Sequence, residues 1–223
     1  MDILIKHEMF EMEVLEKLNT SKMLEAVVFG GGTMLRLCHE LNRYSVDLDF
    51  WITKNIMIKK YFDNLFEILK KEYEVTDAKI EYHTILFELR SQNYPKRLKI
   101  EIRKELKECD FQEMIAFSKY SNKQVILKTH TLEQAMKNKI AAFFDRNEIR
   151  DCFDIEFLLR RGIKLPLINK EEAGVLIKKL NRFKEVDFKV KLGSILESEM
   201  RKFYIKNKFS YLMGKLKEAE IKI

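Results

Sequence analysis

Residues 29–50 read FGGGTMLRLCHELNRYSVDLDF, and the first half of this stretch predicts a strand, a turn and a helix. The apolar residues Ala26–Phe29 have the pattern of a short buried strand, and Thr33 opens a pattern with helical spacing. Glycines between a strand and a helix let the backbone approach a bulky anion, because no Cβ stands in the way. The helix N-terminus adds free N–H groups and the positive end of its dipole. Gly31 and Gly32 therefore predict a triphosphate site.

The second half of the stretch carries a pair of carboxylates. Asp47 and Asp49 alternate with apolar residues, so they project from one face of a strand, about 6–7 Å apart. Aspartate is unfavourable in strands, and two like charges this close need a cation to relieve their repulsion. Carboxylate oxygens suit Mg²⁺, which commonly shares them with substrate phosphates. Glu101, on an expected neighbouring strand, completes a predicted two-metal site for Mg²⁺ or Mn²⁺ formed by Asp47, Asp49 and Glu101.

Composition places these residues in a folded, partly basic protein. Of the 223 residues, 46% are apolar, which is enough for a sizeable core, and the two signs of charge are interspersed. Residues 131–223 hold 21 basic and 14 acidic side chains, which accounts for the entire net charge of +7. A basic lobe attracts polyanions such as nucleic acid or triphosphates; the alternative is that its lysines only line solvated helix faces.

Several features predict a cytoplasmic location. Cys38, Cys109 and Cys152 show no CxxC pairing and are interpreted as reduced thiols. The N-terminal residues are too few and too charged for a signal peptide. No apolar run approaches the roughly 20 residues that a membrane span needs, so we expect no membrane association.

Periodicity predicts an α+β fold with two lobes. In the first lobe, residues 1–128, we expect helices over 4–18, 33–41 and 56–73, and strands over 26–29, 46–51, 79–91, 97–104 and 124–127. The second lobe, residues 129–223, is expected to be all-helical and basic, with helices over 131–144, 150–160, 170–182 and 192–218. The helix over 150–160 should end at Gly162.

Two motifs resemble those of a known family. Phe29–Leu37 followed by Arg43–Phe50 is similar, almost position by position, to the first motif of the AbiEii/AbiGii-type toxins. These are minimal nucleotidyltransferases of the DNA polymerase beta-like superfamily. A second match, to the family's helical motif, comprises Lys139–Ala142, Arg146, Arg150, Asp151 and Asp154. The resemblance covers about residues 27–160 and implies a minimal nucleotidyltransferase-type mixed sheet with flanking helices.

The resemblance also implies roles for individual residues. Gly31, Gly32 and Thr33 would cradle triphosphate oxygens, with Ser45 supporting the turn. Asp47 and Asp49 would bind the metal ions, and Glu101 would be the third carboxylate and the general base for the acceptor hydroxyl. Lys139 and Arg146 would neutralise phosphate charge. Asp154 would orient Lys139 or assist the acceptor. Lys139 lies beside an apolar stripe, so the alternative is a lysine that only extends its stem along the core.

The leading functional hypothesis is therefore metal-dependent transfer of a nucleotide from a nucleoside triphosphate (NTP) to an acceptor. The resemblance implies a toxin of a toxin–antitoxin or abortive-infection pair, with an antitoxin as partner. The acceptor would be RNA, tRNA being attractive given the basic lobe, or a protein. Two alternatives stay open. One is a catalytically inactive nucleotide- or RNA-binding protein, and the other is a small-molecule, antibiotic-type nucleotidyltransferase.

Overall fold

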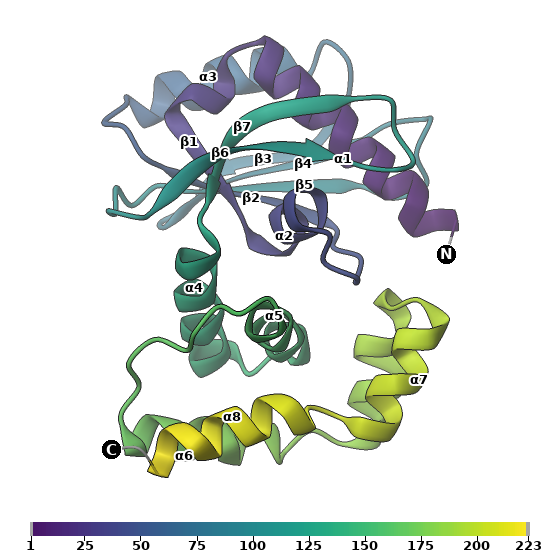
Figure 1. Cartoon of the computed structure of the whole chain (residues 1–223). Coiled ribbons are helices and arrows are strands. Elements are labelled where there is room, and N and C mark those ends of the chain that lie inside the picture. Colours follow the sequence, from purple (N-terminus) through teal and green to yellow (C-terminus); the bar gives the residue numbers. More distant parts are fainter. Residues whose placement is uncertain (1, 222–223) are drawn as a thin grey trace. The chain divides into compact units, whose positions relative to one another are not determined.

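The computed structural model describes residues 2–221 and divides the chain into two compact units, Met1–Thr131 and Leu132–Ile223 (Figure 1). The first unit, coloured purple to teal, combines a sheet with helices. The second unit, coloured green to yellow, contains helices only within its described residues.

A mixed seven-stranded sheet forms the centre of the first unit, in the order β3-β4-β5-β2-β1-β7-β6. Neighbours β1 and β7, and β2 and β5, run parallel, and the other neighbours run antiparallel. The sheet confirms the expected α+β class. Its strands are β1 (Val27–Gly30), β2 (Asp47–Ile52), β3 (Glu74–Ile80), β4 (Thr84–Arg90), β5 (Leu98–Arg103), β6 (Phe111–Phe117) and β7 (Gln124–His130).

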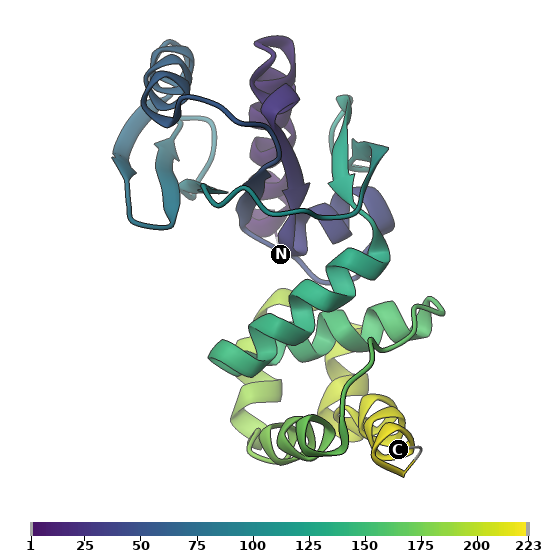
Figure 2. The same cartoon turned by 90° about the vertical axis from the view of Figure 1, so that its left-hand side faces the viewer.

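Three α-helices accompany this sheet, namely α1 (Asp2–Thr20), α2 (Gly31–His39) and α3 (Ile58–Leu69), with a 3₁₀ turn at Met23–Ala26. Figure 2 shows α3 beside the β3–β4 end of the sheet. Phe62 of α3 stacks on the fully buried Phe87 of β4, with ring centroids 5.0 Å apart. In β2 the apolar residues Leu48, Phe50 and Ile52 are buried and the alternate residues are half-buried. The sheet therefore has an apolar face that belongs to the core and a more exposed face.

The more exposed face is called the carboxylate face below. On β2 and β5 it is formed by Asp47, Asp49, Trp51, Lys99, Glu101 and Arg103. It results from the period-two alternation of both strands, because successive side chains of a strand point to opposite faces.

Two strands of this sheet differ from the sequence expectation. The strand expected over residues 79–91 is a hairpin instead, in which β3 and β4 pair antiparallel around residues 81–83. The turn residues Glu81, Tyr82 and His83 include no glycine or proline, so the turn gave no composition signal. Strand β6 was not predicted. Its outward residues Phe111, Ile115 and Phe117 are 44–49% exposed, so its apolar residues do not mark a core-facing side.

The second unit is built from α4 (Leu132–Arg146), α5 (Ile149–Arg160), α6 (Lys170–Leu180), α7 (Ser198–Asn207) and α8 (Ser210–Ile221), with a π-helical turn at Asp187–Leu192 and a 3₁₀ turn at Gly193–Ile195. A single helix over 192–218 was wrong. The helical conformation is interrupted between α7 and α8, where Lys208 has φ +49° and the following Phe209 is buried. None of the helices within residues 2–221 is both long and apolar enough to cross a bilayer.

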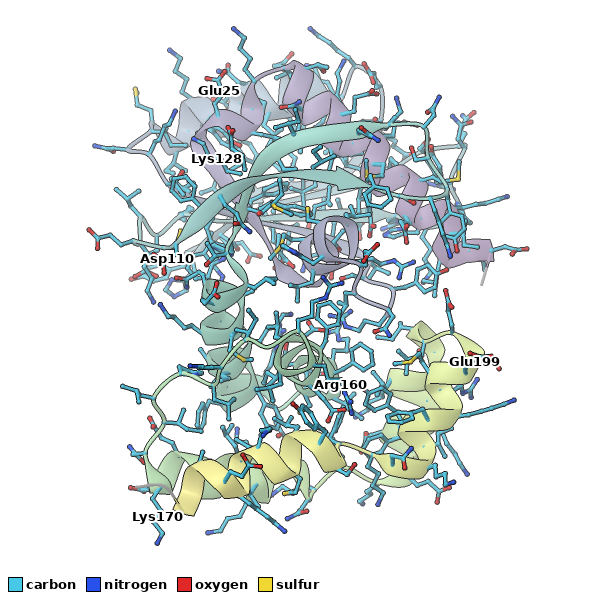
Figure 3. All side chains as sticks on the ribbon, in the orientation of Figure 1. Glu25, Asp110, Lys128, Arg160, Lys170 and Glu199 are labelled. Carbon is cyan, nitrogen blue, oxygen red and sulfur yellow. The ribbon has the colours of Figure 1, made fainter. Side chains whose placement is uncertain are left out.

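A buried carboxylate joins the helices of this unit. Glu156 of α5 is fully buried and accepts hydrogen bonds from the Tyr204 hydroxyl (3.1 Å) and the Leu212 backbone N–H (3.0 Å). Arg160, labelled in Figure 3, donates to Glu156 at 3.0 Å and lies 4.6 Å from the ring centroid of Tyr211. A buried charge is tolerated only when it is paired and hydrogen-bonded, so this cluster fixes α5 against α7 and α8.

Gly162 ends α5 as predicted. Its φ of +86° lies in the left-handed region, where glycine carries no Cβ penalty. The N–H groups of Gly162 and Ile163 donate to the carbonyls of Leu159 (3.0 Å) and Leu158 (3.1 Å), which satisfies the last turn of the helix.

Candidate active site

The turn from β1 to α2 packs directly against the carboxylate of Asp49. Gly31 has φ +73°, and a Cβ at this position would lie 2.8 Å from Cγ and 2.9 Å from Cβ of Asp49, with the carboxylate oxygen Oδ2 nearer still. A Cβ on Gly32 would lie 2.8 Å from Oγ of Ser45. Both glycines are therefore required by close approach, and the predicted anion cradle and one predicted metal ligand lie side by side within one unit.

Thr33 links the start of α2 to the start of β2. Its side chain is fully buried, and its hydroxyl donates a 2.6 Å hydrogen bond to the backbone carbonyl of Asp47. The sequence interpretation gave Thr33 a direct contact with triphosphate oxygens. Because the hydroxyl donates to β2, we expect any such contact to come from the backbone N–H of Thr33.

The three predicted metal ligands lie on one face of two adjacent strands. In the parallel pairing of β2 and β5, Asp49 is opposite Glu101 and Asp47 is opposite Lys99. All four side chains are half-buried on the carboxylate face. The alternation predicted from the sequence therefore brings Glu101 next to Asp49.

Lys99 is a residue of this face to which the sequence interpretation gave no role. Its ammonium forms an ion pair with Glu101. The hydrogen bond to Glu101 and the negative charges of Asp47 and Asp49 raise the pKa of Lys99 above its usual 10.5. Lys99 is two residues before Glu101, so the strand alternation that selected Glu101 also placed a cation on the same face.

The carboxylate face fits a divalent cation that is bound together with a triphosphate. Mg²⁺ usually takes one or two protein carboxylates and completes its shell with phosphate oxygens and water. Asp47 and Asp49 supply two such carboxylates beside the glycine turn. Within residues 2–221, no three His, Cys, Asp or Glu side chains are arranged to hold a metal ion. Glu101 pairs with Lys99, and its role as a third ligand stays a prediction.

A buried polar network holds the loop that leads into β2. Arg36 forms an ion pair with Glu8 of α1, and its Nη1–H donates to the backbone carbonyl of Leu41 at 3.1 Å. Nε2 of His7 lies 2.8 Å from the backbone carbonyl oxygen of Val46. Burial lowers the pKa of His7, so the ring is neutral near pH 7 and donates Nε2–H. Buried carbonyls need donors, so these contacts fix the approach to Asp47.

Lys139, Arg146 and Asp154 belong to the second unit, where they form a charge cluster. The Lys139 ammonium lies 2.7 Å from Oδ2 of Asp154 and 3.5 Å from Oδ1 of Asp151. Arg146 donates two hydrogen bonds of 2.8 Å to Asp151. Both aspartates are fully buried and Lys139 is 8% exposed. Asp154 and Lys139 are therefore ion-paired, and an orienting role of Asp154 stays a prediction. The action of Lys139 and Arg146 on phosphates stays a prediction.

Comparison with known families identifies the class to which this arrangement belongs. A sequence model of the family described as "Nucleotidyl transferase AbiEii toxin, Type IV TA system" matches residues 13–210, which is most of the chain. The chain belongs to the AbiEii nucleotidyltransferase toxin family. The match includes every predicted site residue in both units of this AbiEii protein, from Gly31 to Asp154.

Solved structures agree with the fold of this AbiEii protein. A nucleotidyltransferase candidate from H. pylori is 20% identical, with a TM-score of 0.57, over 94% of this chain and 96% of that chain. JHP933 from Helicobacter pylori is also 20% identical, with a TM-score of 0.52, over 94% and 93% of the two chains. At this identity the likeness concerns the fold alone. Among curated proteins, no match to the chain was found.

Proposed function

We propose that this AbiEii protein transfers a nucleotide from an NTP to an acceptor, with divalent cations bound at Asp47 and Asp49. The observation that carries the proposal is the packing of Gly31 against the Asp49 carboxylate, which leaves no room for a Cβ between the turn that we assign to the triphosphate and the side chain that we assign to the metal ion. A triphosphate at the N-terminus of α2 would then have its oxygens beside Asp47 and Asp49, where Mg²⁺ or Mn²⁺ can be shared.

The chain's own groups have distinct parts in the proposed reaction. The N–H groups at the start of α2 bind phosphate oxygens, and the two glycines admit them without steric conflict. In the transfer, the acceptor oxygen bonds to the α-phosphorus while the bond from that phosphorus to pyrophosphate breaks. Glu101 is the candidate to take the acceptor's proton. Bound divalent cations would supply charge stabilisation for the attacking and leaving oxygens.

The partners follow from family and charge. The family description names type IV toxin–antitoxin systems, so we expect a cognate antitoxin. The excess of basic side chains in residues 131–223 favours a polyanionic acceptor, and we propose RNA, with tRNA as the first to test and protein as the alternative acceptor.

Label transfer tests the proposal. The protein is incubated with each α-labelled NTP, Mg²⁺ or Mn²⁺, and in separate reactions with cellular RNA, protein or small hydroxyl compounds. We expect label on a macromolecule, and loss of at least 10²-fold in Asp47→Asn because the neutral amide oxygen is a weaker ligand for a divalent cation than the carboxylate. Asp63→Asn is the matched control, since Asp63 is an exposed carboxylate on α3 that pairs with Lys59.

Three outcomes would contradict the proposal. Nucleotide binding without transfer by the wild type would identify a binding protein. Label found only on small hydroxyl compounds would identify an antibiotic-type enzyme. Full activity in Asp47→Asn would place the site elsewhere.

A further inference from the structure

The carboxylate face has a third pair of residues beyond the predicted metal ligands. Trp51 of β2 is directly opposite Arg103 of β5, in the row next to Asp49 and Glu101. The guanidinium carbon of Arg103 lies 5.1 Å from the ring centroid of Trp51. Because side chains two residues apart share a face, the indole is about 6–7 Å along the strand from the Asp49 side chain.

The indole is anchored from the side of β7. His130 packs against it with ring centroids 4.9 Å apart and an interplanar angle of 84°. His130 is 1% exposed, and its own ring lies so close to Gly30 that a Cβ there would be 2.8 Å from Nδ1. His130 and β1 therefore hold Trp51 in place through contacts that do not involve Arg103.

Arg103 is exposed at the end of β5. Within residues 2–221 it forms no ion pair, although Glu101 is two residues away on the same strand and Asp49 is on the next strand. Lys99 is the partner of Glu101 instead. The guanidinium lies over the indole instead, and its planar fork offers five N–H donors to a ligand.

This combination suits a nucleobase. Bases stack on aromatic rings and on guanidinium planes, and an arginine fork also donates to the acceptor atoms of a base edge. A phosphate or an acidic side chain would use the charge of Arg103 but not the indole. We propose that Trp51 and Arg103 form a nucleobase-binding subsite of the carboxylate face, an inference that rests on nucleotidyl transfer at Asp47 and Asp49. The base belongs either to the NTP or to the RNA acceptor, and the experiment separates the two sources.

Trp51 is the only tryptophan of the chain, so its fluorescence reports on this subsite alone. The wild-type protein is titrated with each NTP and Mg²⁺, with short single-stranded RNA, and with inorganic triphosphate and Mg²⁺. We expect quenching by a ligand that carries a base and none by inorganic triphosphate. Quenching by NTP alone assigns the subsite to the NTP, and quenching by RNA alone assigns it to the acceptor. If neither an NTP nor the RNA quenches the fluorescence, the inference is overturned.

Substitution provides the second readout. In Trp51→Leu and Arg103→Met, the KM of the base-bearing ligand should rise about tenfold, with kcat within about threefold of wild type, because stacking acts on binding. Trp51→Phe should retain most of the affinity, and Arg103→Lys should lose part of it because a lysine has no plane to stack. Phe66→Leu is the matched control, since Phe66 of α3 also lies under a cation, Lys70, at 5.5 Å.

The outcomes separate this inference from the proposed function. Suppose that Asp47→Asn abolishes transfer, while Trp51→Leu and Arg103→Met keep wild-type KM values. This result would refute the subsite and leave the proposed function standing. Transfer that is unaffected in Asp47→Asn would refute the function itself. If Trp51→Leu does not fold, the exposed Arg103 carries the test, and an unchanged KM in Arg103→Met overturns the inference.

Discussion

Gly31→Ala tests whether the glycine turn positions the Asp49 carboxylate. The new methyl carbon would be 2.9 Å from Cβ and 2.8 Å from Cγ of Asp49. Carbon atoms in contact prefer about 3.5 Å or more, so the turn and β2 must separate by about 0.6 Å. Rotation of the Asp49 side chain does not relieve this contact, because its Cβ is fixed to the backbone. Alanine at φ +73° also costs about 1–2 kcal/mol.

Gly162→Ala is the control for the backbone cost. Gly162 has a similar φ of +86°, but a Cβ there meets no atom within 4 Å. We expect Gly162→Ala to lower the free energy of unfolding by about 1 kcal/mol, a shift in Tm of about 2–4 °C, with unchanged transfer. Gly31→Ala should lose at least as much stability and, because a displacement approaching 1 Å costs up to about 10²-fold, should lower kcat by about 10- to 100-fold.

The assay is label transfer at saturating NTP, with urea unfolding of both variants in parallel. Gly31→Ala with more than half of the wild-type kcat would refute the reasoning, since the carboxylate would then tolerate the displacement. Equal losses of activity in Gly31→Ala and Gly162→Ala would refute it too, because general destabilisation would explain both.

Three further predictions concern electrostatics. Burial lowers the pKa of His130 from 6.5 to about 4, so between these pH values only the unfolded chain binds the proton, and stability should fall by up to about 3 kcal/mol as pH drops from 6.5 to 4. In His130→Gln, urea unfolding across this range should show a pH slope smaller by about one proton. Arg36→Met should lower the free energy of unfolding by about 3 kcal/mol because Glu8 stays buried without its cation, and adding Glu8→Gln should recover part of the loss. Lys99→Gln removes a cation beside the carboxylates, so calorimetry should find Mg²⁺ binding roughly fivefold tighter, and unchanged binding would count against a metal role for Glu101.

The sequence predicted the parts of the fold that rest on local patterns. The strand–glycine–helix unit and the alternation of β2 were readable because each involves neighbours in the chain. The same alternation placed Glu101 on the correct face of β5, and the register then put it opposite Asp49. Helix α5 and its end at Gly162 followed from periodicity and from a glycine that can adopt positive φ.

Other features depend on contacts that no local pattern records. His7 and Val46 are 39 residues apart, and Glu8 and Ser118, which share a buried hydrogen bond, are 110 residues apart. A histidine in an amphipathic helix has no spacing that reveals its partner. The pairing of Lys99 with Glu101 depends on how two flexible side chains meet on the sheet surface, and alternation predicts only that they share a face.

The geometry of the motif bears on whether the protein is active or only binds nucleotides. Thr33 binds the backbone carbonyl of Asp47, a group that any residue at position 47 would offer. Gly31 is needed to make room for Asp49, but a smaller uncharged residue at position 49 would fit the same space. The packing of the turn therefore requires the glycines and the threonine and does not require two carboxylates. Two aspartates that are two residues apart on one strand point to the same face, so they repel each other and reduce the stability of the strand. Lys99 on the same face offsets part of this repulsion. Because the packing of the turn does not require both acids, their joint presence is consistent with the proposed metal site and gives the Asp47→Asn test its weight.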